Sequence, residues 1–154
     1  MQSRLNPFAA APDSMKAMMD LSAAVNAGSI EHSLAELVKI RASQINGCAN
    51  CLHMHTKDAR EAGETEARIY LLSAWRESRL YTARERAALA WTEAMTLVAD
   101  THVPQDVYEQ AKAQFTPKEM VDLTMLVIAI NAWNRIAVGF SFVHPEDAKH
   151  AAAA

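Results

Sequence analysis

Apolar side chains recur every three to four residues along most of this chain, which is the spacing of helices that bury one face. The two clearest stripes consist of Leu34, Leu37, Val38 and Ile45, and of Ile69, Leu72 and Trp75. Strict alternation of apolar and polar residues over strand-length runs is absent, and the Asn46-Gly47 pair lies between helical patterns rather than between the arms of a hairpin. The pattern therefore predicts an all-α fold.

Capping residues divide this pattern into seven predicted helices. Ser33, Thr82 and Thr116 each stand three residues before a glutamate, which is the capping-box spacing at a helix start. Three of the four glycines follow predicted helix ends, where a left-handed residue is favoured. The expected helices cover residues 13–26, 33–46, 48–63, 66–77, 82–99, 104–114 and 116–142. They would form a compact bundle, whereas the tail from about residue 145 carries no packing signal and is expected to be frayed.

Length and charge narrow the class of protein. A chain of 154 residues is long enough for a single domain, 1–154, with one core. Its formal net charge of −3 does not fit a nucleic-acid or membrane-binding surface, so we expect neither partner. The N-terminus has no apolar core of signal-peptide length, and the longest apolar-rich run, residues 123–133, is shorter than a membrane span. We expect a soluble cytoplasmic protein whose partners are small molecules or proteins.

Both cysteines lie in the short stretch GCANCLHMH, residues 47–55. A helix that begins at Cys48 places Cys48, Cys51 and His55 on one face and turns His53 away from it. Unpaired backbone N–H groups and the positive end of the helix dipole favour thiolates there, and a nearby imidazole can hold the departing proton. In such a Cys-x-x-Cys pair, one thiolate can attack a peroxide or disulfide and the other can close an intramolecular disulfide. The thioredoxin fold, in which this motif is common, does not fit because strand patterns are lacking.

A wider pattern surrounds the cysteines: Glu36-x11-Cys48-Ala-Asn-Cys51-x3-His55, preceded by IRASQING and followed by HTKDAREAG. Near the end of the chain stands AINAWNRIAV, residues 129–138. These segments resemble the alkyl hydroperoxidase D branch of the carboxymuconolactone decarboxylase family, and the resemblance extends from about residue 4 to residue 142. The spacing of the glutamate, the cysteine pair and the histidine is the specific part of the match.

The resemblance implies an all-helical homo-oligomer, a trimer or hexamer, that reduces organic hydroperoxides or hydrogen peroxide without a metal, flavin or haem cofactor. Cys51 would be the attacking, peroxidatic thiol, and Cys48 the more exposed resolving thiol through which a dithiol protein or small thiol restores the pair. Glu36 and His55 would form the proton relay that deprotonates Cys51 through water. Well-studied members carry a histidine immediately before the second cysteine, where this chain has Asn50. That departure affects any relay through position 50 and the use of the same lipoyl-protein reductant.

Several alternatives stay open on sequence alone. Glu36 is also the last residue of the Ser33 capping box, which would explain a glutamate there without catalysis. The cysteine pair and His55 could ligate zinc with His53 as a fourth ligand, although His53 lies off the shared face. The chain would then be a non-enzymatic redox-sensing or zinc-binding oligomer. If no zinc is bound, His53 is a secondary candidate for a role beside the Glu36–His55 proton relay. The family scaffold could also perform a lyase or isomerase step, although the decarboxylases of the family lack the cysteine pair.

Two amides stand out on the apolar last predicted helix. Asn131 and Asn134 follow Cys48 and Cys51 by 83 residues each, and the surrounding segments align. Buried amides need hydrogen-bond partners, so we expect these two to cap a helix, bridge helices or face the site.

Overall fold

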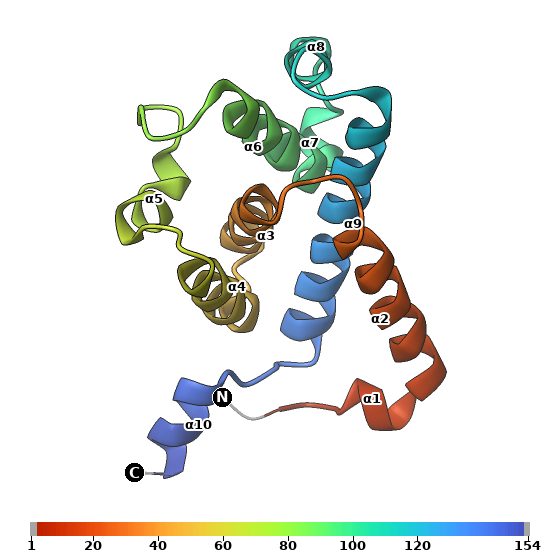
Figure 1. Ribbon diagram of the computed structural model, residues 1–154. Helices are drawn as coiled ribbons and strands as arrows, with labels where there is room; N and C mark the ends of the chain where they lie inside the picture. Colours follow the sequence, from red (N-terminus) through yellow and green to blue (C-terminus); the bar gives the residue numbers. More distant parts are fainter. Residues whose placement is uncertain (1–2, 153–154) are drawn as a thin grey trace.

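The computed structural model describes residues 3–152, and within that range it is helical without β-strands (Figure 1). The helices are α1 (Pro7–Ala10), α2 (Pro12–Asn26), α3 (His32–Asn46), α4 (Ala49–Glu61), α5 (Glu66–Tyr70), the 3-10 helix η1 (Leu72–Ala74), α6 (Ala83–Thr96), α7 (Val98–Thr101), α8 (Gln105–Lys112), α9 (Pro117–Gly139) and α10 (Pro145–Ala152). The prediction of an all-α fold is confirmed.

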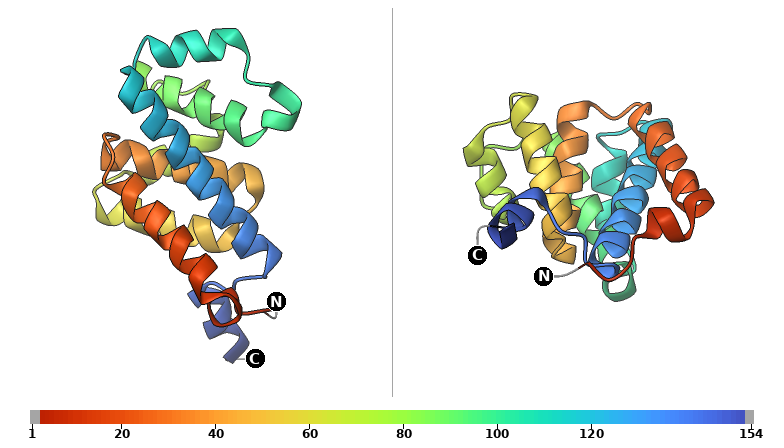
Figure 2. Two further views of the ribbon diagram at one scale, coloured as in Figure 1. Left: turned by 90° about the vertical axis from the view of Figure 1, so that its right-hand side faces the viewer. Right: turned by 90° about the horizontal axis from the view of Figure 1, so that it is seen from below.

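Helix α3 lies at the centre of the bundle, in contact with α4, α6 and α9 (Figure 1). The longest helix, α9, has 23 residues and runs along the molecule with α2 packed beside it (Figure 2). The end of the bundle that α8 covers is formed by α6 and the start of α9. At the other end α2, α4 and the second half of α9 are neighbours, and the candidate site lies there.

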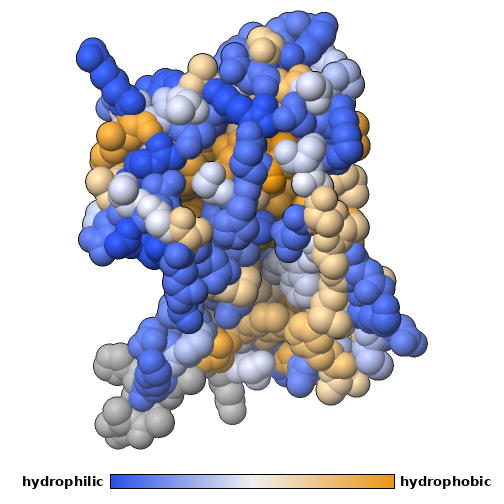
Figure 3. All heavy atoms as spheres, in the orientation of Figure 1, coloured by the Kyte–Doolittle hydropathy of each residue, from blue (hydrophilic) through white to orange (hydrophobic). Residues whose placement is uncertain are grey.

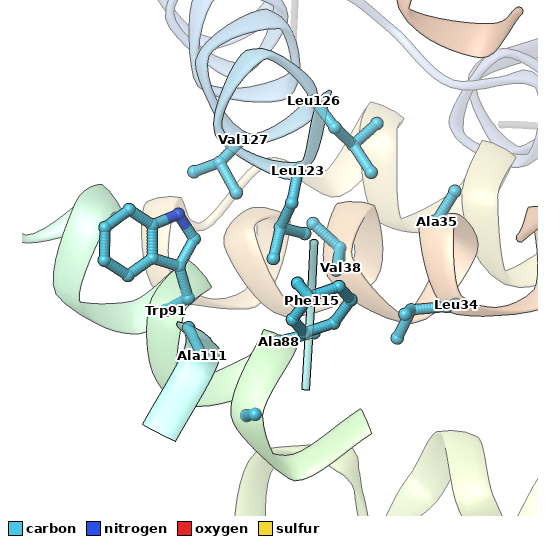
Figure 4. Packing of buried hydrophobic residues seen from close by; sticks show 11 residues of the cluster. Leu34, Ala35, Val38, Ala88, Trp91, Ala111, Phe115, Leu123, Leu126 and Val127 are labelled. Atoms are coloured by element: carbon cyan, nitrogen blue, oxygen red, sulfur yellow. The ribbon is translucent and has the colours of Figure 1, made fainter. Parts of the chain in front are cut away.

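The larger hydrophobic cluster joins α3, α6 and α9, with Phe115 packed among them (Figure 4). Its buried members are Leu34, Ala35, Val38, Ala87, Ala88, Trp91, Ala111, Phe115, Leu123, Leu126 and Val127. A second cluster contains Leu37 and Ile40 of α3 together with Leu72 and Trp75. Because α3 has core on more than one side, polar residues on this helix can also be buried, and this matters for Glu36.

Two of the three predicted capping boxes are confirmed. Thr82 accepts a hydrogen bond from the backbone N–H of Glu85, whose side chain accepts the backbone N–H of Thr82 in return. Thr116 and Glu119 form the same reciprocal pair at the start of α9. Such pairs satisfy donors that a helix start otherwise leaves free.

The third capping box, at Ser33, is wrong. Helix α3 already begins at His32, and its N-terminus has no side-chain cap. The side chain of Glu36 turns into the protein instead of back to Ser33, and it bonds to His55 and Lys39. His55 from α4 and Lys39 from the same helix therefore take the place of the predicted capping box.

Other predicted boundaries shift where the chain bends. The single helix expected over residues 66–77 is divided at Leu71 into α5 and η1, although its predicted inward residues are buried. The helix expected over residues 82–99 ends at Thr96, and α7 follows it. The sequence pattern did not predict α1, which begins at Pro7 after the side chain of Asn6 caps two backbone N–H groups.

The segment after α9 also differs from expectation. Instead of a frayed tail, residues 145–152 form α10, while residues 153–154 lie outside the described part of the chain. Just before α10, the ring of His144 stacks on that of His53 with 5.4 Å between centroids. This contact brings the C-terminal segment beside the first turns of α4.

Helix α9 is, within the described residues, the one helix long and apolar enough to cross a membrane by length and composition. It packs against α2, α3 and α6, and its buried residues include Leu123, Leu126 and Ile130. A core helix of a soluble protein can have the same length and composition.

Candidate active site

The turn between α3 and α4 places both cysteines. Gly47 ends α3 in a left-handed conformation (φ 64°, ψ 34°), in which a side chain would be strained. The backbone N–H of Cys48 then donates to the carbonyl of Ser43 at 3.0 Å. Cys48 is the N-cap of α4, and its Sγ accepts the backbone N–H of Cys51 at 3.3 Å. The helix therefore begins one residue later than predicted.

The two sulfurs are joined as a disulfide, with the Cα atoms of Cys48 and Cys51 5.4 Å apart. Cys48 is 1% exposed and Cys51 is 2% exposed, so the greater exposure expected for Cys48 is wrong. As the N-cap, Cys48 is enclosed at the helix start, in a cluster with Ile130 and Ala137 of α9. The two cysteines differ instead in what they face, because only Cys51 lines the cavity beside α4.

A buried hydrogen-bonded cluster joins α3 to α4. Glu36 is 3% exposed, and its Oε2 lies 2.9 Å from Nδ1 of His55. Its Oε1 accepts a hydrogen bond from Nζ of Lys39 at 2.8 Å. Nε2 of His32, on a largely exposed side chain, lies 3.9 Å from the same oxygen. Glu36 and His55, both predicted from sequence, are thus in contact, and His55 lines the same cavity as Cys51.

The partners of Glu36 set its charge. Burial alone would raise the pKa of the Glu36 carboxyl, but hydrogen bonds from His55 and Lys39 outweigh burial and hold this pKa below the ordinary value of 4.5. Glu36 is therefore a carboxylate at neutral pH. A carboxylate beside Nδ1 keeps a proton on that nitrogen and leaves Nε2 of His55 as an acceptor. In this arrangement His55 can take a proton while Glu36 stabilises the imidazolium that forms.

A cavity of about 520 Å³ opens beside α4, walled mainly by residues of α2, α4 and α9, with Lys39 from α3. Cys51, His55 and Asn50 belong to its wall, whereas Cys48 and Glu36 do not. Most of the remaining wall is apolar and includes Met19, Val25, Met54, Leu126, Ile130, Trp133 and Phe142. Figure 3 shows the surface hollowed between α4 and α2, with apolar residues in the hollow. A sulfur and an imidazole in the wall of an apolar cavity can act together on a small molecule inside it.

An amide network fixes the end of α3 to α9, directly before the cysteine turn. Nδ2 of Asn46 donates to Oδ1 of Asn131 at 3.0 Å and to Oδ1 of Asn134 at 2.8 Å. Nδ2 of Asn134 donates to Oγ of Ser43 at 3.0 Å. Of the three roles expected for the two late asparagines, the structure shows helix bridging.

Sequence reasoning missed Lys39 and Asp58. Lys39 follows Glu36 by three residues, a spacing at which oppositely charged side chains meet on a helix, and this signal could have identified it. Asp58 follows His55 by three residues, and its carboxylate lies near both His55 and Glu36. His53, the secondary candidate, does not line the cavity and stacks on His144.

Ligand atoms of Glu36, His55 and Asp58 all lie within 4.8 Å of one another, so these residues are the group through which the described part of the chain could hold a metal ion. The ammonium of Lys39, hydrogen-bonded to Glu36, opposes a further cation there. The zinc set considered from sequence is arranged differently, because the two sulfurs are bonded to each other and His53 lies against His144.

Comparison with known proteins identifies the family of this chain. Residues 12–94 match the carboxymuconolactone decarboxylase family. The chain belongs to this family. The uncharacterized protein YdfG of Bacillus subtilis (strain 168) is 44% identical over 138 residues, which cover 90% of this chain and 94% of YdfG.

Solved structures place the chain more closely within the family. A protein of unknown function from Agrobacterium tumefaciens, provisionally described as the antioxidant defence protein AhpD, has a TM-score of 0.91 and 46% identity, covering 94% of this chain and 99% of its own. The AhpD core of a peroxidase-related protein from Ralstonia eutropha JMP134 shares the fold at a TM-score of 0.78 and 17% identity, covering 91% of this chain and 75% of its own. The resemblance to the alkyl hydroperoxidase D branch is thereby confirmed.

Proposed function

We propose that this protein is a thiol-dependent hydroperoxide reductase in which Cys51 attacks the peroxide. The observation that carries the proposal is that Cys51 lines an apolar cavity together with His55, whose other ring nitrogen is bonded to the buried carboxylate of Glu36. Membership of the AhpD-like branch supports the same chemistry.

The cycle begins when His55 takes the proton of Cys51, directly or through water, and the thiolate attacks one oxygen of the O–O bond. The sulfur becomes a sulfenic acid, and the alkoxide that leaves takes a proton from His55 to give the alcohol. The thiol of Cys48 then attacks the sulfenic sulfur, which releases water and forms the Cys48–Cys51 disulfide. A dithiol protein or small thiol returns two electrons and two protons through thiol–disulfide exchange.

The reductant meets the disulfide at Cys51 in this scheme. Cys48 is enclosed by α9 and lies outside the cavity wall, so the cavity offers the approach to the pair. Asn50 stands in the same wall and supplies a neutral amide where well-studied members have an imidazole. We therefore expect a small thiol, or a dithiol on a slender arm, to reduce this protein more readily than a bulky protein surface does.

We further propose that the chain works as a homo-oligomer of three or six subunits in the cytoplasm. Helix α9 exposes large apolar side chains on the single chain, among them Val121, Ile128 and Val138. Exposed apolar residues gathered along one core helix support a surface that a second copy covers.

The test is a thiol titration with intact mass, before and after one equivalent of cumene hydroperoxide. Reduced wild-type protein should lose two thiols and about two hydrogens in mass as the disulfide forms. Cys51→Ser should abolish peroxide consumption, whereas Cys48→Ser should consume one equivalent per chain and then stop. Equal single-turnover rates in Cys51→Ser and the wild type would overturn the assignment of the attacking sulfur.

A redox-sensing role is the second candidate, and the burial of both cysteines favours it, because a buried disulfide is reopened slowly by protein reductants. This role predicts a change of assembly state on oxidation without multiple turnovers. Three measurements separate the two functions. Light scattering compares the assembly of the reduced and oxidised protein, peroxide consumption with excess dithiothreitol measures turnover, and elemental analysis measures bound zinc.

A further inference from the structure

The cavity beside Cys51 has an uneven distribution of charge. Lys39 is the one lysine or arginine among the residues of the described chain that line it, and no aspartate or glutamate is among them. Around this cation the wall is mostly apolar, with Leu126, Ile130 and Trp133 contributed by α9. A largely buried ammonium in such a wall can contact a molecule that occupies the cavity.

The ammonium of Lys39 is held in place and keeps a donor for a ligand. Its side chain is 12% exposed, and Nζ donates to Oε1 of Glu36 at 2.8 Å and to Oδ1 of Asn26 at 3.2 Å. A lysine ammonium carries three N–H donors, so these two contacts, one from α3 and one from α2, leave a third. Because both anchors fix its position, little side-chain freedom is lost when a ligand binds.

Glu36 balances the charge of Lys39, but it lies behind the ammonium and outside the cavity wall, so a ligand in the cavity meets the N–H donors of Lys39 and not the carboxylate. When the proton of Cys51 passes to His55, a thiolate and an imidazolium form together in the wall, so the net charge of the cavity does not change. Among the groups of the wall, the Lys39 ammonium is therefore the one that can both donate a hydrogen bond to an anionic group and attract it in the resting state.

Resting on the proposed reductase function, we propose that Lys39 binds a carboxylate of the substrate, so that the hydroperoxide this enzyme prefers is an apolar molecule that carries a carboxylate. The apolar body packs against α9, the carboxylate accepts a hydrogen bond from Nζ of Lys39, and the peroxide group meets Cys51. The reaction is that of the proposed cycle, with the carboxylate unchanged: the hydroperoxide becomes the alcohol and the cysteine pair becomes the disulfide.

The kinetic test uses two substrates of one skeleton: cumene hydroperoxide with a carboxylate in the para position, and the methyl ester of that compound. A charge-assisted hydrogen bond in a partly buried site corresponds to about tenfold or more in affinity, so kcat/KM of the wild type should be about tenfold higher for the acid. Lys39→Met should remove this preference, and Lys39→Arg should retain most of it. Lys57→Met is the matched control, because Lys57 is exposed on α4 away from the cavity and should leave the ratio unchanged.

The ratio of the two substrates separates binding by Lys39 from an effect through Glu36. If Lys39 only supports the Glu36–His55 pair, Lys39→Met slows both substrates by the same factor, and the acid-to-ester ratio stays at its wild-type value. That result, or a wild-type ratio near one, would overturn the proposal.

A binding experiment makes the test independent of turnover. Calorimetry with 4-isopropylbenzoate and its methyl ester should show about tenfold tighter binding of the acid to the wild type, and no difference in Lys39→Met. This pattern without peroxide turnover would support the carboxylate site and refute the reductase function. Peroxide turnover with equal binding of acid and ester would support the reductase function and refute the carboxylate site.

Discussion

Two glutamates whose side chains have little exposed surface, Glu36 with 4% and Glu93 with 13%, show that similar ion clusters can have different roles. Glu93 on α6 accepts hydrogen bonds from Nε of Arg41 at 2.7 Å and from Nε1 of Trp75 at 2.8 Å, and it pairs with Arg76. In both clusters burial alone would raise the glutamate pKa, and hydrogen bonds from the partners outweigh it and lower the pKa instead.

The two glutamates differ in their hydrogen-bond partners and in whether those partners line a cavity. An arginine does not exchange protons near neutral pH, so Glu93 holds a fixed charge that ties α3, α6 and the segment after η1 together. Glu36 is paired with a histidine, which does exchange protons, and that histidine lines a cavity with a cysteine. A buried carboxylate alone therefore does not identify an active site, but one joined to a proton carrier at a cavity is a strong candidate.

The largest expected effect is on the chemistry of the Glu36 cluster. Glu36→Gln removes the charge that stabilises protonated His55, and the rate of Cys51 oxidation near neutral pH should fall by about 10²–10⁴. Stopped-flow measurement of thiol loss with limiting peroxide checks this. Above about pH 9 much of the defect should disappear, because the thiolate then forms without a base. Glu93→Gln is the matched control, and an equal loss of rate in both variants would remove the distinction between the clusters.

The second prediction concerns stability, which the loss of Glu93 should lower more than the loss of Glu36. Glu93→Gln leaves Arg41 with a poorer partner in a mostly buried site and should lower the free energy of unfolding by about 2–3 kcal/mol. The oxidation rate of Cys51 should change little. Urea denaturation of the reduced protein measures the first quantity. A smaller loss of stability in Glu93→Gln than in Glu36→Gln would contradict a structural role for Glu93.

The smallest effect is the response of stability to acid. Glu93 has a folded-state pKa below the 4.5 expected when unfolded, so its contribution is complete above that value and is lost as the pH falls through the lower folded-state pKa. The urea midpoint of the wild type should therefore be nearly constant above about pH 5 and fall as the pH decreases further, and the midpoint of Glu93→Gln should fall less steeply over that range. A slope unchanged by the substitution would show that the ion pairs of Glu93 add no net stability.

The sequence was informative where a structure depends on neighbouring residues. The pairs Thr82 with Glu85 and Thr116 with Glu119 are capping boxes in the structure as predicted, because each is satisfied within one turn of helix. Ser33 with Glu36 has the same local signature but fails, since the glutamate binds His55 of α4 and Lys39, one turn further along its own helix. The spacing of Glu36 and Lys39 is visible in the sequence, whereas the contact of Glu36 with His55 depends on the tertiary structure.

In the candidate site, too, some features could be predicted from the sequence and others depend on tertiary packing. The family resemblance pointed to Glu36 and His55, which the structure does bring into contact. It also suggested an exposed Cys48, which the packing of α9 against the start of α4 prevents. Lys39 was missed because the functional value of a lysine depends on the cavity it faces, and the cavity is formed by α2, α4 and α9, which are distant in sequence.

The nearly complete burial of the two sulfurs has a kinetic consequence. In a cycle of the proposed kind, oxidant and reductant must occupy the same cavity at different times, since Cys51 meets both there. Each should therefore compete with the other, so that excess hydroperoxide slows the reductive half-reaction by filling the space that the thiol needs. The steady-state rate would rise and then decline with peroxide concentration, and the peroxide concentration at the maximum would increase with the concentration of thiol.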